Sequence, residues 1–235
     1  MLLCFWELGA EKNEMKKITK LFVLAALLMA GSQIHAQEEH QYVDLGLPSG
    51  TLWATCNVGA TTPEGYGDYF AWGETAPKDN VYNDKTYQLY NNFRLTKYCS
   101  TSGFKGLKDN LTQLQSVDDA ATINWGDGWR IPTKAQWEEL LQNTTQEWTE
   151  LNGVNGCLFT AGNGNSVFLP AASRIVEISV PGGLGLEGVY WTSSRHTDYD
   201  TNAWYYAMSK YNKGMDFDKR YWGCSIRPVR FEPKK

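Results

Sequence analysis

Short runs of β-branched and aromatic residues alternate with clusters of Gly, Pro, Asn and Asp along most of this chain. Such runs predict strands, because branched and aromatic side chains fit an extended backbone and the clusters favour turns. Only two segments carry a helical pattern, and no βαβ rhythm is present. The pattern therefore predicts an α+β domain and not a doubly wound one. The predicted strands are Tyr42–Leu47, Thr51–Val58, Ser166–Leu169, Val189–Ser193, Ala203–Met208 and Cys224–Arg230.

The clearer of the two helices begins at a capping box formed by Thr133 and Gln136. Trp137, Leu140 and Leu141 follow at the spacing of one helix face, and the pattern ends two residues later. We therefore expect this helix to bury Trp137 against the sheet.

A shorter helix is expected to open at Ser116 with Asp119. Its expected core-facing residues are Val117, Ala120 and Ala121. Residues 76–109, dense in Asn, Asp, Lys, Thr and Tyr, are expected to form a long irregular excursion. Loops of that length are uncommon unless they serve a function.

An apolar segment near the N-terminus indicates export. Leu21–Ala30 follows three lysines and runs into small and polar residues, which is typical of a secretory signal peptide. About ten residues at about 1.5 Å each are too short to cross the roughly 30 Å of a bilayer core. We expect translation to start at Met15, residues 1–14 to be a mis-assigned upstream start, residues 15–36 to be the signal peptide, and residues 37–235 to form one domain. Cleavage after Ser32 is the rival to cleavage after Ala36.

The net charge of the chain argues against polyanionic partners. The 22 basic and 26 acidic residues give a formal net charge of −4, which does not favour duplex nucleic acid or an anionic membrane. We expect no nucleic-acid partner, no integral membrane span and no cofactor. The expected location is the periplasm, the cell surface or the secreted fraction.

Four cysteines, Cys56, Cys99, Cys157 and Cys224, follow the apolar segment. An even number in an exported protein favours disulfides, and four cysteines allow three pairings. We favour Cys56 with Cys99 and Cys157 with Cys224, with four buried thiols as the alternative. The wide spacing excludes a zinc ribbon or a Cys-Xaa-Xaa-Cys redox site.

Residues Gly183–Gly188 match a dinucleotide-binding fingerprint, but the residues that follow are β-branched and aromatic. That fingerprint needs a helix after it, so we expect a glycine loop and no nucleotide. Arg130 and Arg227, which lie within apolar strings, are expected to bond backbone carbonyls or a carboxylate and not a ligand.

Six segments follow one another along the chain: YVDLGLPSGTLWATCNVGA (42–60), YGDYFAWGET (66–75), NWGDGWRIPTKAQWEELL (124–141), GNSVFLPAA (164–172), GVYWTSS (188–194) and GCSIRPVR (223–230). Together and in this order, they resemble the Fibrobacter succinogenes major paralogous domain family. GWRIPTKAQWEEL also resembles the helix entry of the formylglycine-generating enzyme superfamily. The resemblance implies a C-type-lectin-like fold: a twisted antiparallel sheet, two helices, long irregular loops and paired termini. The chain departs from the family pattern at Ser173, where a glycine is expected.

The segment between two late predicted strands is the candidate ligand site. It mixes aromatic rings with hydrogen-bonding side chains, which suits sugar stacking or a protein interface. A solvated loop with Trp204 in the core is the alternative. The candidate ligand-binding residues are Arg195, His196, Asp198, Tyr199, Asp200 and Trp204. Asp198 with Asp200, and Asp216 with Asp218, could also offer oxygens to calcium, although the calcium-binding strings of true C-type lectins are absent.

These observations predict an exported, non-catalytic module that binds a glycan or a surface protein. One alternative is an enzyme of the formylglycine-generating type, although Cys157 and Cys224 lie far apart in sequence. The other alternative is a structural subunit of a surface appendage.

Overall fold

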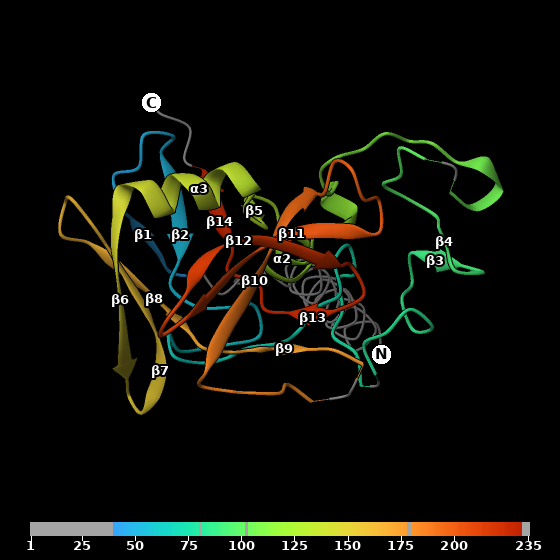
Figure 1. The fold of residues 1–235 in the computed structure, drawn as a ribbon. Helices are drawn as coiled ribbons and strands as arrows, with labels where there is room; N and C mark the ends of the chain where they lie inside the picture. The colour runs from blue at the N-terminus through green and yellow to red at the C-terminus, as the bar shows by residue number, and fades with distance from the viewer. Residues whose placement is uncertain (1–39, 80, 102, 178–179, 232–235) are drawn as a thin grey trace, which may run out of the picture. The chain divides into compact units, whose positions relative to one another are not determined.

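Every pair of named strands in the structure is antiparallel. The structure is a computed structural model that describes residues 40–79, 81–101, 103–177 and 180–231 (Figure 1). The expected signal peptide and upstream start lie outside the described residues. The described residues form small antiparallel sheets with two α-helices, which confirms the α+β prediction.

The first and last described strands lie in one sheet. Its order is β1-β2-β14-β5, with β1 at Tyr42–Asp44, β2 at Thr51–Ala54, β14 at Val229–Phe231 and β5 at Trp129–Arg130. Val229 pairs with both Trp53 and Arg130. The two ends of the described chain therefore close on each other through β2 and β14.

Two three-stranded sheets form most of the remaining strand structure. One is β6-β7-β8 and the other is β10-β11-β12. Their bounds are β6 Thr144–Leu151, β7 Val154–Ala161, β8 Ser166–Pro170, β10 Glu187–Arg195, β11 Asn202–Ser209 and β12 Lys213–Lys219. Two short ladders pair β9 (Arg174–Ile175) with β13 (Gly223–Cys224) and β3 (Tyr90–Asn91) with β4 (Arg94–Leu95).

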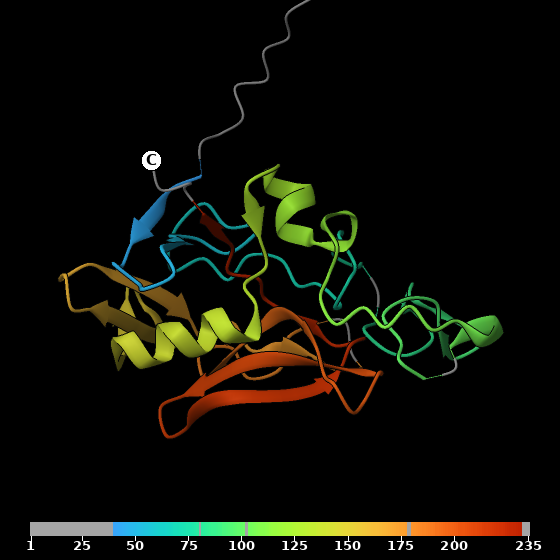
Figure 2. The same ribbon diagram turned by 90° about the horizontal axis from the view of Figure 1, so that it is seen from above.

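The capping-box helix forms as predicted: α3 spans Lys134–Asn143. Gln136 donates its backbone N–H to Thr133 Oγ1 at 3.1 Å, and the backbone N–H of Thr133 donates to Gln136 Oε1 at 2.8 Å. Trp137 and Leu140 are fully buried. α3 contacts β6, β10 and β11, so its apolar face anchors both three-stranded sheets (Figure 2).

The shorter helix differs from the prediction in its start. Residues Ser116–Asp118 form a 3-10 turn, η2, and α2 spans Ala120–Trp125 with Asp119 as its N-cap. Ala120 and Ala121 are buried as expected, whereas Val117 is 66% exposed. The prediction for Val117 was wrong because the 3-10 turn rotates it away from the face that α2 buries.

Strands β10 and β11 of the sheet β10-β11-β12 are buried on both faces. Tyr190 and Tyr206 face α3 and join Trp53 and Trp137 in one core cluster. Their strand neighbours Val189, Trp191, Ala203 and Tyr205 point the other way and join Trp72 in a second cluster. The α3 helix and the excursion thus cover opposite faces of this sheet, which fixes the strands that carry the candidate site.

The excursion over residues 76–109 is irregular as predicted, apart from β3, β4 and the 3-10 turn η1 at Phe104–Gly106. It nevertheless supplies buried side chains to the second core cluster, among them Tyr82, Tyr87 and Tyr98. The sequence analysis missed seven strands of the described chain: the longer strands β6, β7 and β12, and the two-residue strands β3, β4, β5 and β9. β6 and β12 carry mostly polar or charged side chains and no fully buried residue, so neither has an apolar run.

The predicted disulfides Cys56–Cys99 and Cys157–Cys224 are not formed, because all four cysteines are free. Cys157 belongs to the cluster on the α3 side of the sheet, whereas Cys99 and Cys224 belong to the cluster on the other side. Burial raises the pKa of the Cys157 thiol to about 11. The alternative of packed thiols describes Cys99, Cys157 and Cys224, while Cys56 is half-buried.

Two smaller predictions are confirmed, one on the glycine motif and one on the two arginines. A strand, β10, follows the glycine motif. Arg227 donates to the carbonyls of Ala54 and Thr55 at 3.0 and 2.7 Å, and Arg130 donates to the carbonyl of Trp129 at 2.7 Å. No helix among the described residues is long and apolar enough to cross a membrane.

Ser173, where a glycine was expected, has φ +57°. This left-handed conformation costs any residue with a Cβ atom, which gives a physical reason for a glycine there. Its buried hydroxyl donates to the carbonyl of Gly182.

Candidate functional site

Three of the candidate residues come together with a fourth, Phe217, in a cluster that we call the aromatic ladder: His196, Tyr199, Trp204 and Phe217. The His196 ring stacks on Trp204 at 4.9 Å between centroids and lies 5.2 Å from Tyr199 and 4.0 Å from Phe217. Tyr199 and Phe217 stack at 5.9 Å. None of the four belongs to a core cluster. The alternative of Trp204 in the core is therefore wrong.

The ladder is positioned by the β10–β11 connection and by β12. Trp204 faces Phe217 across the β11–β12 ladder. In the connection, the backbone N–H of His196 donates to the Asn202 carbonyl at 3.0 Å, and that of Asn202 donates to the Tyr199 carbonyl at 2.9 Å. The tight connection thus folds His196 and Tyr199 back over the Trp204–Phe217 pair.

A charged pair on α3 lies beside Trp204. Lys134 Nζ lies 4.6 Å from the centre of the Trp204 ring, and it forms an ion pair with Glu138 one turn further along α3. A cation above an aromatic face is attracted by the ring quadrupole. Trp204 therefore contacts both His196 and Lys134, and these contacts fix its position in the ladder.

The ladder keeps a free face and two free donors. Tyr199 is 56% exposed. Among the described residues, neither the Tyr199 hydroxyl nor the Trp204 indole N–H has a hydrogen-bond partner, and the indole N–H is not fully buried. An exposed ring beside two donors is an arrangement that can stack on a sugar face and bond its hydroxyl groups.

His196 is held as a neutral acceptor. Its Nδ1 accepts the backbone N–H groups of Asp198 at 3.1 Å and Tyr199 at 3.3 Å. Burial lowers the pKa of His196, with Asp198 opposing and Arg195 adding to the shift. A proton on Nδ1 would face two N–H donors, so the neutral ring fits this connection and the cation does not.

Arg195 and Asp200 are buried and bond each other, so they do not face a ligand. Asp200 also accepts from the backbone N–H groups of Ser100 and Thr101 at 2.9 and 2.8 Å and from their hydroxyls at 2.8 and 2.6 Å. Burial opposes ionisation, but these hydrogen bonds outweigh it and lower the pKa of Asp200. The pair ties the excursion to the connection that carries the ladder.

The remaining acidic candidates do not assemble into a metal site. Asp198 is exposed beside the ladder. Asp216 and Asp218 accept the backbone N–H groups of the residues that follow them, Phe217 and Lys219, each at 2.8 Å. No group of three or more His, Cys, Asp or Glu side chains with metal-binding geometry occurs in the part of the chain that the structure describes.

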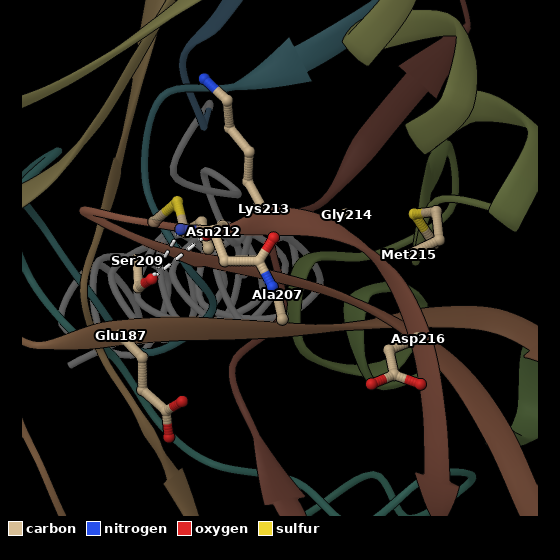
Figure 3. A pocket seen from close by; sticks show the side chains of 9 residues that line it. Glu187, Ala207, Ser209, Asn212, Lys213, Gly214, Met215 and Asp216 are labelled. Carbon is tan, nitrogen blue, oxygen red and sulfur yellow. Dashed lines mark hydrogen bonds between the residues drawn. The ribbon is translucent and has the colours of Figure 1, made fainter.

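A hollow of about 330 Å³ lies over the opposite end of the same sheet, around the turn between β11 and β12 (Figure 3). Its floor includes the small residues Ala207 and Gly214, and the carboxylates of Glu187 and Asp216 flank it. Lys213 points away from it and donates to the Gln146 carbonyl at 3.0 Å. The hollow includes none of the aromatic ladder residues, and of its lining residues only Asp216 was raised from sequence, as a calcium candidate.

Comparison with known proteins found no matching family model, no matching curated protein and no matching solved structure.

Proposed function

We propose that this chain is an exported, non-catalytic binding module with a C-type-lectin-like fold, and that it holds a neutral glycan on the aromatic ladder. The fold part of the proposal is supported by the antiparallel sheets, the two helices and the pairing of β2 with β14. The location part is supported by the apolar segment at residues 21–30. The resemblance to the paralogous domain family, which implies a C-type-lectin-like fold, also supports the fold part of the proposal.

The observation that carries the binding proposal is the ladder itself. His196, Trp204 and Phe217 are packed on one another and on Lys134, so they fix the orientation of the exposed Tyr199 ring. A fixed aromatic side chain loses little conformational entropy when a ligand stacks on it. The free hydroxyl and indole N–H then give the sugar hydroxyls partners.

The charges around the ladder favour a neutral ligand. Lys134 is paired with Glu138, and Arg195 is paired with Asp200. Neither cation is free to bind an anionic sugar. The exposed carboxylate of Asp198 would accept hydroxyl groups and would repel a carboxylated or sulfated glycan.

The test is a calorimetric titration of the chain with a panel of neutral β-linked hexasaccharides. We expect at least one to bind, and we expect Tyr199→Ala to weaken that binding by about fivefold, because an aromatic stacking contact contributes on the order of 1 kcal/mol. Tyr211→Ala is the matched control, since Tyr211 is 91% exposed at the far end of the β11–β12 hairpin.

Equal binding by the Tyr199 and Tyr211 variants, or no binding by the unsubstituted chain, would overturn the proposal. The alternatives of an enzyme and of an appendage subunit gain no support from the described residues.

A further inference from the structure

The sheet β10-β11-β12 has one strand edge without a partner among the described residues. β10 forms bridges beyond β11, at Tyr190 with Ser225 and at Gly188 with Ser173. β12 pairs with β11 only. An unpaired edge carries free N–H and C=O groups and can accept a strand from another chain. The unpaired edge of β12 must therefore be protected against the addition of a strand from another chain.

Hydrogen bonds on β11 identify which β12 groups face outward. The carbonyls of Asn202 and Trp204 accept bonds from the β10 side, from the His196 backbone and the Thr192 hydroxyl. These β11 residues therefore do not bond β12, although they lie opposite Lys219 and Phe217 in the register. Since hydrogen-bonded and non-bonded pairs alternate, the N–H groups of Phe217 and Lys219 point away from β11.

Those two outward N–H groups are the ones that aspartates cover. Asp216 Oδ1 accepts the Phe217 N–H and Asp218 Oδ1 accepts the Lys219 N–H, each at 2.8 Å. The same parity places the Met215 N–H on this edge as well. At the beginning of the strand, Lys213 reaches across to the Gln146 carbonyl of β6. The open part of the edge thus runs from Met215 to Lys219. Its aspartates accept hydrogen bonds from two of the three outward N–H groups, those of Phe217 and Lys219.

The same aspartates oppose pairing of β12 with a second copy of itself. In an antiparallel pair centred on Phe217, Asp216 of each chain would face Asp218 of the other. In a pair centred on Asp216, the two Asp216 carboxylates would face each other. Like charges directly opposite in a ladder are destabilising, so both central registers are disfavoured.

We propose that Asp216 and Asp218 keep the outer edge of β12 closed to strand addition by a second copy of this chain. They act by covering the Phe217 and Lys219 N–H groups and by placing carboxylates opposite carboxylates in the dimer. This role is independent of glycan binding, and it accounts for two of the four aspartates that the sequence raised as calcium candidates.

The experiment compares two double variants of the chain. Asp216→Ala with Asp218→Ala removes both the cover and the charge, whereas Asp216→Asn with Asp218→Asn removes the charge and keeps an oxygen acceptor. The control, Asp79→Ala with Asp127→Ala, makes the same charge change at two exposed aspartates outside β12. Light scattering after size exclusion gives the oligomeric state, and circular dichroism confirms that each variant is folded.

We expect the unsubstituted chain and the control to stay monomeric over the concentration range used. The alanine variant should dimerise at least about tenfold more tightly than either, and the asparagine variant should fall between. Hydrogen exchange should slow at the Met215, Phe217 and Lys219 amides of the dimer. A folded alanine variant that stays monomeric would overturn the proposal. So would a dimer of the unsubstituted chain protected at these amides, or a control that dimerises equally.

Discussion

Replacing Asp200 with alanine tests whether the structure assigns this candidate residue correctly. Asp200 accepts four hydrogen bonds from Ser100 and Thr101 and pairs with the buried Arg195. Removing one partner of a buried ion pair costs about 3–5 kcal/mol, because the other charge is left without compensation. Domain stabilities are about 5–15 kcal/mol. The substitution should therefore remove a large share of the free energy of unfolding.

Denaturant unfolding followed by tryptophan fluorescence measures the effect. The Asp200→Ala midpoint should fall with little change in slope, as for a loss of stability without a change in exposed area. Asp198→Ala is the control, because Asp198 is exposed two residues away and its removal should change stability by no more than about 0.5 kcal/mol. A loss below about 1 kcal/mol for Asp200→Ala would refute the structural role of the pair.

The pH dependence of the free energy of unfolding tests the role of Asp200 in a second way. The pKa of Asp200 is lower in the folded chain than in the unfolded chain. Its contribution to stability is thus full above the ordinary carboxyl pKa of about 4 and is lost as the pH falls towards the folded value. The stability difference between the unsubstituted chain and Asp200→Asn should shrink below about pH 4. A difference that stays constant through that range would contradict this assignment.

Three further predictions concern single sites. Phe93→Gly should raise the free energy of unfolding by about 1 kcal/mol. Asn92 and Phe93 form a turn with φ of +49° and +59°, a conformation that glycine adopts without strain, and Phe93 is 66% exposed. A lower melting temperature would contradict this prediction. Lowering the pH from about 7 to 5 should destabilise the chain through His196, whose pKa is lowered on folding, so the unfolded chain takes up the proton first. His196→Asn, which keeps an acceptor near Nδ1, should flatten that slope in denaturant titrations, and an unchanged slope would count against the neutral ring. Thr133→Ala should cost about 1 kcal/mol by removing the α3 cap, and a calorimetric melting shift near zero would argue against the capping box.

The features that the sequence predicts well are those set by neighbouring residues. The α3 cap depends on Thr133 and Gln136, three positions apart, and the structure confirms it. Strands such as β10 and β11 carry dense apolar runs because both of their faces are buried. Local chemistry also predicts that a strand, and not a helix, follows the glycine motif.

The features that the sequence misses depend on contacts between distant segments. β12 is an edge strand in which Phe217 stands between two aspartates, so its sequence has no apolar run. Phe217 was therefore not recognised as a member of the site. The roles of Arg195 and Asp200 depend on Ser100 and Thr101, about one hundred positions away. A run of polar and aromatic residues in the sequence does not distinguish an ion pair that holds a loop from a side chain that faces a ligand.

The most direct test of the binding account is a two-dimensional NMR titration with the hexasaccharide that binds most tightly. We predict that the Trp204 indole N–H and the Tyr199 amide shift first and saturate together, while the amides of Ala207 and Gly214 in the hollow stay unchanged. Shifts confined to the hollow, or none at the aromatic ladder, would contradict the account.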